Sequence, residues 1–139
     1  MLDETARHLL AGSNYAAFTS LLPDGQPSTH LMWVGSDDTH VLINTKTDRQ
    51  KLANVKRDPR VVVTVFESGN PGRYTEIRGR VEEIVGEPEA KEHFVQLSNK
   101  YTGAPWSGPT QGERVMLRIR PQRVRSHDGT VATASQGPP

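Results

Sequence analysis

The pattern of apolar and polar residues divides the chain into short elements separated by turn residues. Near the N-terminus, the apolar residues between Leu2 and Leu10 recur at the spacing of one helix face. Asp3 is placed to cap the start of this helix and Gly12 to end it. The spacing therefore predicts a helix whose apolar face packs on the main body of the protein.

Two strands joined by a tight turn are predicted next. Residues 15–22 and 28–34 are strand-like, and Pro23-Asp24-Gly25 lies between them. This sequence favours a turn because proline presets its own φ and glycine tolerates a positive φ. Gly35-Ser36-Asp37-Asp38 predicts a second turn, followed by a third strand over residues 39–45.

A helix is predicted after the third strand. Thr47-Asp48-Arg49-Gln50 matches a capping box, in which the first and last side chains bond to each other's backbone N–H groups. Pro59 disfavours a helical Asp58, so the helix should end near Arg57. The following strand, residues 60–66, contains four valines, which suggests burial on both of its faces.

The C-terminal half continues the strand pattern with one more helix. Residues 73–85 predict a long strand with a bulge or bend at Gly79, and Glu87-Pro88 opens a helix. Residues 114–120 alternate strictly between apolar and polar positions and predict a strand, while residues 123–127 are predicted as a separate edge strand after Pro121.

The elements together predict a mainly β fold. Six or seven strands with tight turns, and helices only at crossovers, are typical of an antiparallel barrel or sandwich. We expect a single domain over residues 1–127. Residues 128–139 are small, polar and rich in proline and glycine, which predicts a disordered C-terminal tail.

Composition and charge narrow the function classes. The 139 residues contain no cysteine, which excludes disulfides, thiolate catalysis and cysteine metal sites. The five histidines are scattered one per element, so no metal site is predicted. A net charge of +1 argues against nucleic-acid binding. The polar N-terminus and the lack of long apolar runs indicate a cytoplasmic protein with no membrane span.

The common catalytic signatures are missing. The chain has no G-x-S-x-G, H-E-x-x-H, P-loop or G-x-G-x-x-G sequence. Asp37-Asp38 lies in a predicted turn, and Glu82-Glu83 straddles a predicted strand so that its side chains point to opposite faces. Neither pair is predicted to act as an acid–base dyad.

Positive charge is concentrated in residues 46–60. This stretch contains six basic residues and two acidic ones, in a chain whose net charge is +1. A helix N-terminus with free N–H groups and nearby cationic side chains favours phosphate or a similar anion. Composition alone fits an ordinary solvated basic helix face at least as well.

Three segments, in this order and spacing, resemble the pyridoxamine 5′-phosphate oxidase-like split-barrel family of flavin and deazaflavin enzymes: DGQPSTHLMWV, VLINTKTDRQKLANVKRDPRVVVTV and RYTEIRGRVEEI. The most specific part is the K-x-x-N-x-x-R-D-P-R block of residues 51–60. The resemblance covers residues 11–124 and is greatest to the group that uses coenzyme F420, a deazaflavin with a phospholactyl-oligoglutamate tail. It implies a six-stranded antiparallel split β-barrel, the FMN-binding split barrel, with short crossover helices. It also implies a homodimer with cofactor sites at the subunit interface.

The resemblance further implies a cofactor site. Arg49 and Lys51 would hold the cofactor phosphate with Asn54 beside them, whereas Asn44 and Thr45 would face the ring or the ribityl chain. The remaining cofactor-binding candidates by position are Leu31, Met32, Trp33, Lys46, Arg57, Arg60 and Trp106.

These remaining candidates have different expected roles. The segment 31–33 would pack against the ring, although Trp33 fits a core or dimer-interface residue equally well. Arg57 and Arg60 would either hold the anionic tail of coenzyme F420 or only fix the helix to the barrel. Trp106 would anchor its loop or close over a ligand. Phe94 and Tyr101, which lie at helix spacing, are predicted as helix core.

The function implied by the resemblance is an oxidoreductase that uses reduced coenzyme F420 to transfer a hydride to a small organic electrophile. No catalytic side chain is expected, because such a cofactor supplies the redox chemistry; Tyr74 and water are the candidate proton donors. The alternatives are an FMN-dependent pyridoxamine 5′-phosphate oxidase-like enzyme and a non-enzymatic flavin- or haem-binding barrel. Pyridoxamine phosphate itself is disfavoured as substrate for two reasons. Gln50 separates Arg49 from Lys51 where the flavin-phosphate site of that enzyme has adjacent arginine and lysine, and its substrate-phosphate signature has no clear counterpart near the C-terminus. The sequence does not specify the substrate.

Overall fold

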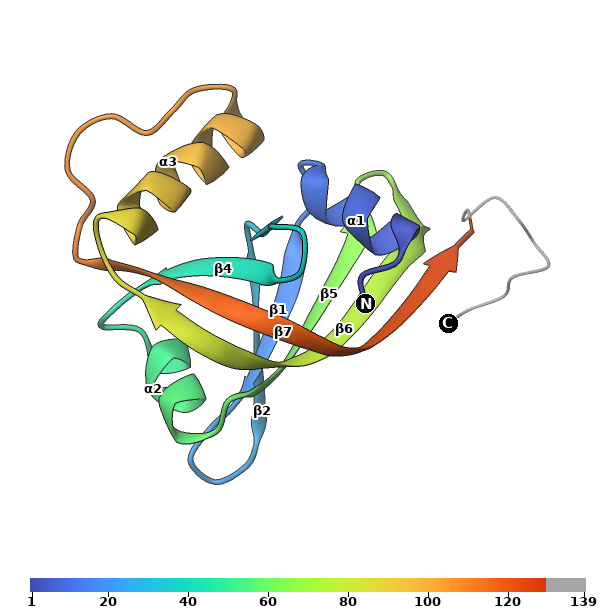
Figure 1. The fold of residues 1–139 in the computed structure, drawn as a ribbon, viewed down its shortest axis with the longest axis horizontal. Coiled ribbons are helices and arrows are strands. Elements are labelled where there is room, and N and C mark those ends of the chain that lie inside the picture. The colour runs from blue at the N-terminus through green and yellow to red at the C-terminus, as the bar shows by residue number, and fades with distance from the viewer. Residues whose placement is uncertain (130–139) are drawn as a thin grey trace.

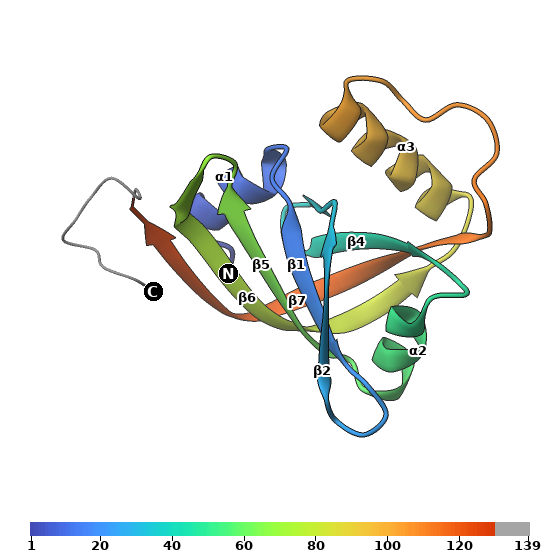
Figure 2. The same ribbon diagram turned by 180° about the vertical axis from the view of Figure 1, so that it is seen from behind.

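The computed structural model describes residues 1–129 and shows one curled, fully antiparallel sheet with three helices (Figures 1 and 2). The strand order is β2-β1-β5-β6-β7-β4-β3. The elements are α1 (Glu4–Ala11), β1 (Ala16–Leu21), β2 (Pro27–Met32), β3 (Gly35–Ser36), β4 (Val41–Lys46), α2 (Gln50–Arg57), β5 (Arg60–Glu67), β6 (Asn70–Val85), α3 (Glu89–Thr102) and β7 (Arg114–Asp128).

The predicted mainly β split barrel is confirmed, with seven strands in place of six. The additional strand is β3, whose two residues pair with β4 where the sequence predicted only a turn. Long strands β6 and β7 run side by side through the sheet, while α2 and α3 lie toward one end (Figure 1). No helix within residues 1–129 is long and apolar enough to cross a membrane.

The core lies inside the curl of the sheet. Strand β1 and residues 115–119 of β7 contribute buried apolar side chains such as Phe18 and Leu117, and α1 covers one end with Leu9 and Leu10, all fully buried. Asp3 caps α1 as predicted, since its carboxylate accepts from the Ala6 backbone N–H at 2.8 Å. A smaller cluster between the sheet and α3 contains Leu42, Ala90 and Met116.

The strand that is buried on both faces is β4, and the expectation for β5 was wrong. Residues 41–45 of β4 are all buried because α3 covers the outer face of this strand. In β5, Val61, Val63 and Val65 are buried but Val62 is partly exposed, so this strand alternates. A run of β-branched residues thus marks a strand without showing how many of its faces are covered.

The start of α2 also differs from the prediction. The helix begins at Gln50 with Arg49 in the cap position, and no side chain caps it. The Thr47 backbone N–H donates to the Glu113 carbonyl at 3.0 Å, which prolongs the β4–β7 pairing and delays the helix. The predicted end is confirmed, since Asp58 is extended and the helix stops at Arg57.

One strand, β7, replaces the two that were predicted on either side of Pro121. Pro121 pairs with Gly79, where the β6–β7 register shifts, and a bulge tolerates the missing proline N–H. Asp128, assigned from sequence to the tail, is the last residue of β7 and pairs with Arg73. Gly129, also assigned to the tail, is buried, and its carbonyl accepts from Asn70 Nδ2 at 3.1 Å. Residues 130–139 lie outside the described residues.

The bulge at Gly79 provides the first prediction. A Cβ on Gly79 would lie 2.4 Å from the Arg120 carbonyl oxygen, which is backbone and cannot easily move. We expect Gly79→Ala to lower the free energy of unfolding by about 1–3 kcal/mol in a urea titration, as overpacking does. Gly86→Ala is the matched control, because no atom of residues 1–129 lies within 4 Å of the position of its Cβ. Equal stability of the two variants would contradict the close approach.

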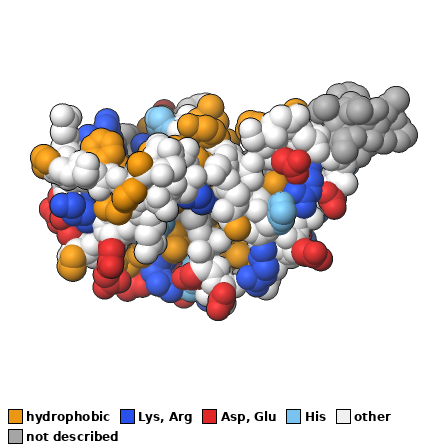
Figure 3. All heavy atoms as spheres, turned by 90° about the horizontal axis from the view of Figure 1, so that it is seen from above, with side chains coloured by type: hydrophobic (Ala, Val, Ile, Leu, Met, Phe, Trp, Pro, Cys, Tyr) orange, Lys and Arg blue, Asp and Glu red, His pale blue; other side chains and the backbone are white. Residues whose placement is uncertain are grey.

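The face of the molecule shown in Figure 3 carries interspersed basic and acidic side chains, with apolar side chains reaching the surface between them. The large apolar residues that are exposed include Leu31 at 71% and Trp106 at 45%. Leu31 lies on β2, which stands at one edge of the sheet and is mostly exposed. An edge strand with such a side chain leaves backbone and apolar surface open to a further contact.

Candidate functional site

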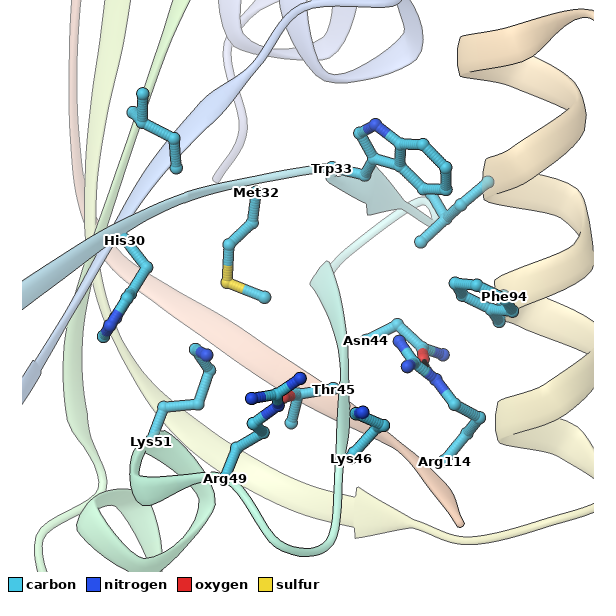
Figure 4. Close-up of a pocket in the computed structure, with 12 residues that line it drawn as sticks. His30, Met32, Trp33, Asn44, Thr45, Lys46, Arg49, Lys51, Phe94 and Arg114 are labelled. Carbon is cyan, nitrogen blue, oxygen red and sulfur yellow. Dashed lines mark hydrogen bonds between the residues drawn. The ribbon is translucent and has the colours of Figure 1, made fainter. Parts of the chain in front are cut away.

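A pocket of about 310 Å³ lies between β2, the end of β4, the start of α2, α3 and the start of β7 (Figure 4). Eight of its twelve lining residues are among the predicted cofactor-binding residues. The lining consists of His30, Leu31, Met32, Trp33, Asn44, Thr45, Lys46, Arg49, Lys51, Phe94, Leu97 and Arg114.

Basic side chains form one side of this pocket. Figure 4 shows those of Lys46, Arg49 and Lys51 opposite Met32, the last residue of β2, and Trp33, which follows it. Lys46 ends β4, Arg49 occupies the cap position of α2, and Lys51 lies in its first turn. The short connection from strand to helix therefore brings three cations to one rim, beside the free N–H groups of a helix start.

Little negative charge compensates the cations of the pocket, which also include Arg114. Burial, followed by the nearby Arg49 and Arg114, lowers the pKa of Lys51. Burial and Arg49 likewise lower the pKa of Arg114, against the opposing effect of Glu87. Within residues 1–129, no carboxylate forms an ion pair with Lys51 or with the Arg114 guanidinium, and Asp48 is 3.9 Å from Arg49. An anion in the pocket would relieve this repulsion.

Aromatic rings form the other end of the pocket. Trp33 stacks on Phe94 with 6.2 Å between centroids and on Tyr101 with 5.2 Å. Phe94, predicted as helix core, instead faces the pocket, and the Arg114 guanidinium lies 4.1 Å from its ring centroid. Tyr101 lies behind this wall, where its hydroxyl donates to the Asn14 carbonyl at 2.6 Å.

Asn44 lines the pocket, but its side chain is buried and fully engaged. Its Oδ1 accepts from Arg114 Nε at 2.8 Å, and its Nδ2 donates to the Ala90 carbonyl at 2.7 Å and to His93 Nδ1 at 3.0 Å. Asn44 therefore holds Arg114 in place, while its predicted contact with the ring or the ribityl chain stays a prediction. Thr45 also lines the pocket and is 3% exposed.

Asn54, Arg57 and Arg60 are not brought to the pocket. Asn54 is 1% exposed; its Nδ2 donates to Ser20 Oγ at 3.0 Å, so it ties α2 to β1 and does not lie free beside Lys51. Arg57 donates to the Leu21 carbonyl. This contact fixes α2 to the barrel, which was one of the two roles considered for Arg57. Arg60 forms an ion pair with Asp58 at 2.6 Å. These three side chains therefore have protein partners away from the pocket lining, and their predicted phosphate and tail contacts stay predictions.

Trp106 and Tyr74 also lie outside the pocket lining. Trp106 contacts Phe94 with 5.4 Å between ring centroids but is half exposed. Tyr74 stacks on His127 and lines a separate hollow with Glu76 and Arg125. Tyr74 of one chain is therefore not placed to donate a proton in the pocket of that chain.

Four lining residues were not among the candidates: His30, Phe94, Leu97 and Arg114. Arg114 is the most consequential, and its position follows from the pairing of β7 with β4, in which it stands opposite Lys46. The strict alternation of β7 placed Arg114 on the polar face, but the register that brings it to the pocket is not visible in the sequence. No group of three or more metal-binding side chains occurs within the described part of the chain.

The position of Asn54 leads to the second prediction. We expect Asn54→Ala to lower the free energy of unfolding by about 1–3 kcal/mol, because Ser20 Oγ loses its partner in a buried site. Ligand affinity of the pocket should stay unchanged. A double-mutant cycle with Ser20→Ala in urea checks that the loss comes from this hydrogen bond. If Asn54→Ala instead weakens ligand binding and leaves the free energy of unfolding unchanged, Asn54 contacts the ligand.

Comparison with known proteins agrees with this geometry. The sequence profile described as Pyridoxamine 5′-phosphate oxidase matches residues 2–128. The chain belongs to the pyridoxamine 5′-phosphate oxidase family. The predicted family resemblance is therefore confirmed. None of the curated proteins matches the chain.

Two solved structures are similar to this chain in sequence as well as in fold. A protein described as an F420 reductase is 32% identical, with a TM-score of 0.78, over 86% of this chain and 94% of its own. The conserved hypothetical protein Rv2991 from Mycobacterium tuberculosis is 30% identical, with a TM-score of 0.76, over 100% of this chain and 89% of its own. General Stress Protein 26 from Bacillus anthracis, at 18% identity and a TM-score of 0.70 over 89% of this chain and 92% of its own, shares the fold.

Proposed function

We propose that this protein is an oxidoreductase that binds coenzyme F420 in the pocket between β2, β4 and α3 and reduces a small organic electrophile. The family and the similarity to an F420 reductase support a flavin or deazaflavin oxidoreductase. The observation that carries the proposal is a set of weakly compensated cations opposite an apolar and aromatic wall, in one pocket. A flat ring attached to a phosphate matches both halves of such a pocket.

The residues present fit this cofactor. Arg49 and Lys51 would hold the phosphate, because charge-assisted hydrogen bonds from cations at a helix start are the strongest contacts the pocket offers. Met32 and Trp33 would pack against the ring system. Bound coenzyme F420 in its reduced form supplies the hydride, so the protein needs to bind, orient and exclude water.

The number of cations favours coenzyme F420 over FMN. Both cofactors carry a phosphate, but Lys46 and Arg114 add positive charge to that of Arg49 and Lys51 in the same pocket. Four cations carry more positive charge than a single phosphate neutralises. They suit a ligand with further carboxylates, such as an oligoglutamate tail. Arg57 and Arg60, which were the sequence-based candidates for the tail, already have protein partners.

A second copy of the chain would complete the site. Edge strand β2 forms one wall of the pocket, and its residues His30 and Leu31 are exposed at that wall. Leu31 at 71% exposure suits burial against a partner, which would also enclose the bound cofactor. We therefore propose a homodimer that covers β2.

A binding titration tests the proposal. The full chain is titrated with coenzyme F420 and, separately, with FMN, and affinity is measured by ligand fluorescence. We expect F420 to bind at least about tenfold more tightly, equal to about 1.4 kcal/mol. Tighter FMN binding would favour the flavin alternative, and binding of neither would refute a cofactor role for the pocket.

A further inference from the structure

His93 of α3 lies behind the wall of the pocket and is only 8% exposed. Its imidazole does not line the pocket, but its Nδ1 lies 3.0 Å from Asn44 Nδ2. Asn44 in turn accepts from Arg114 Nε at 2.8 Å. These contacts join α3, β4 and β7 in one hydrogen-bonded chain that ends at the pocket guanidinium.

The partners of Asn44 determine the tautomer of His93. Arg114 Nε can only donate and the Ala90 carbonyl can only accept, so the amide of Asn44 has one possible orientation. Its second N–H then points at His93 Nδ1, which must accept. His93 is therefore a neutral imidazole whose proton sits on Nε2.

The opposite nitrogen has no partner. His93 Nε2 is buried without a hydrogen-bond partner among residues 1–129, and it lies 3.1 Å from the position that a Cβ on Gly35 would occupy. A buried N–H without an acceptor destabilises the fold, and an apolar residue here would avoid that cost. A histidine here offers one thing that an apolar residue cannot, which is the Nδ1 lone pair that accepts from Asn44.

We propose that His93 is a positioning residue: its Nδ1 holds the Asn44 amide, which aims the Arg114 guanidinium into the pocket for the anionic groups of the ligand. The identity of that ligand rests on the proposed function, but the hydrogen-bonded chain does not. Burial and the positive charges of Lys100 on α3 and Arg114 on β7 lower the pKa of His93 to about 4. The imidazole therefore stays neutral near pH 7, as an accepting Nδ1 requires.

Two substitutions at His93 separate this role from simple packing. In His93→Asn, the side-chain Oδ1 can take the position of Nδ1 and accept from Asn44, whereas His93→Leu fills space without an acceptor. We expect His93→Leu to weaken coenzyme F420 binding about tenfold. This is the factor expected when the misaligned Arg114 guanidinium loses one charge-assisted hydrogen bond to the ligand. His93→Asn should bind within about threefold of the original chain, a change well below that factor. Equal weakening in both variants would overturn the proposal.

Repeating the His93→Leu substitution in an Arg114→Leu variant distinguishes the positioning role from simple packing. If His93 acts through Arg114, His93→Leu should cause no further loss of affinity once Arg114 is absent. An undiminished tenfold loss in that background would mean that His93 acts by another route.

A readout without cofactor keeps this inference distinct from the proposed function. In ¹⁵N NMR of the unliganded chain, we expect the Arg114 Nε–H to be protected from solvent exchange and His93 to carry its proton on Nε2. Protection should persist in His93→Asn and be lost in His93→Leu. If coenzyme F420 fails to bind while these signals behave as expected, the proposed function fails and the positioning role stands; a proton on Nδ1, or protection that persists in His93→Leu, overturns the role.

Discussion

Replacing Arg49 and Lys51 together with alanine is expected to weaken coenzyme F420 binding by roughly 100-fold or more. A hydrogen bond to a charged group contributes about 1.5–3 kcal/mol, so two such contacts to one phosphate correspond to at least about 3 kcal/mol. Both side chains line the pocket, and neither is committed to a buried partner elsewhere in residues 1–129. Their loss should therefore act on ligand binding and not on the fold.

The stability of the Arg49→Ala/Lys51→Ala variant and a control substitution at Lys56 test this prediction further. Burial lowers the pKa of Lys51, and the positive charges of Arg49 and Arg114 lower it further, which shows that the three cations repel one another. The double variant should consequently unfold at the same or a higher urea concentration than the original chain. Lys56→Ala removes an exposed cation of the same helix that does not line the pocket, and affinity should remain within about twofold. A fluorescence titration that finds equal affinity in all three proteins would remove Arg49 and Lys51 from the site.

Acidification is expected to destabilise the protein through His93. Its pKa is about 4 in the folded chain, compared with an ordinary value of 6.5. Because the folded-state pKa is the lower one, the unfolded chain takes up the proton first as the pH falls. The stability associated with the neutral imidazole is therefore complete above about pH 6.5 and is lost progressively toward pH 4. A difference of this size corresponds to about 3 kcal/mol over that range.

The His93→Asn variant isolates this effect from other titrating groups. Asparagine does not titrate, and the carboxylates contribute equally to both proteins. Urea unfolding at several pH values between 7 and 4 should show a steeper loss of stability in the original chain than in the variant. Parallel pH dependences would show that His93 is protonated as easily in the folded protein as in the unfolded one.

The predicted site residues that the structure brings together in one pocket are those that lie close together in the sequence. Residues 31–33 and 44–46, with Arg49 and Lys51, come from two short segments whose resemblance to a cofactor-binding family could be seen directly. Phe94 and Arg114 were missed because they reach the pocket through the packing of α3 and the register of β7 against β4. Pairing between distant strands is set by the whole sheet and leaves no local mark in the sequence.

The wrong start predicted for α2 has a related cause, and Asn54 shows the same kind of tertiary contact. Thr47 has the residue type of a helix cap, but its backbone N–H is taken by Glu113, which lies far along the chain. Asn54 follows Lys51 at helix spacing, yet Ser20 on β1 provides its buried partner. In both cases a polar residue with a plausible local role is engaged by a tertiary contact, and only the fold shows which of the two prevails.

A crystal structure of the chain with coenzyme F420 tests the central claim most directly. We predict that the cofactor phosphate lies within hydrogen-bonding distance of Arg49 and Lys51, with the ring system against Met32 and Trp33. A phosphate bound instead near Arg57 or Arg60, or a ring outside this pocket, would contradict the account.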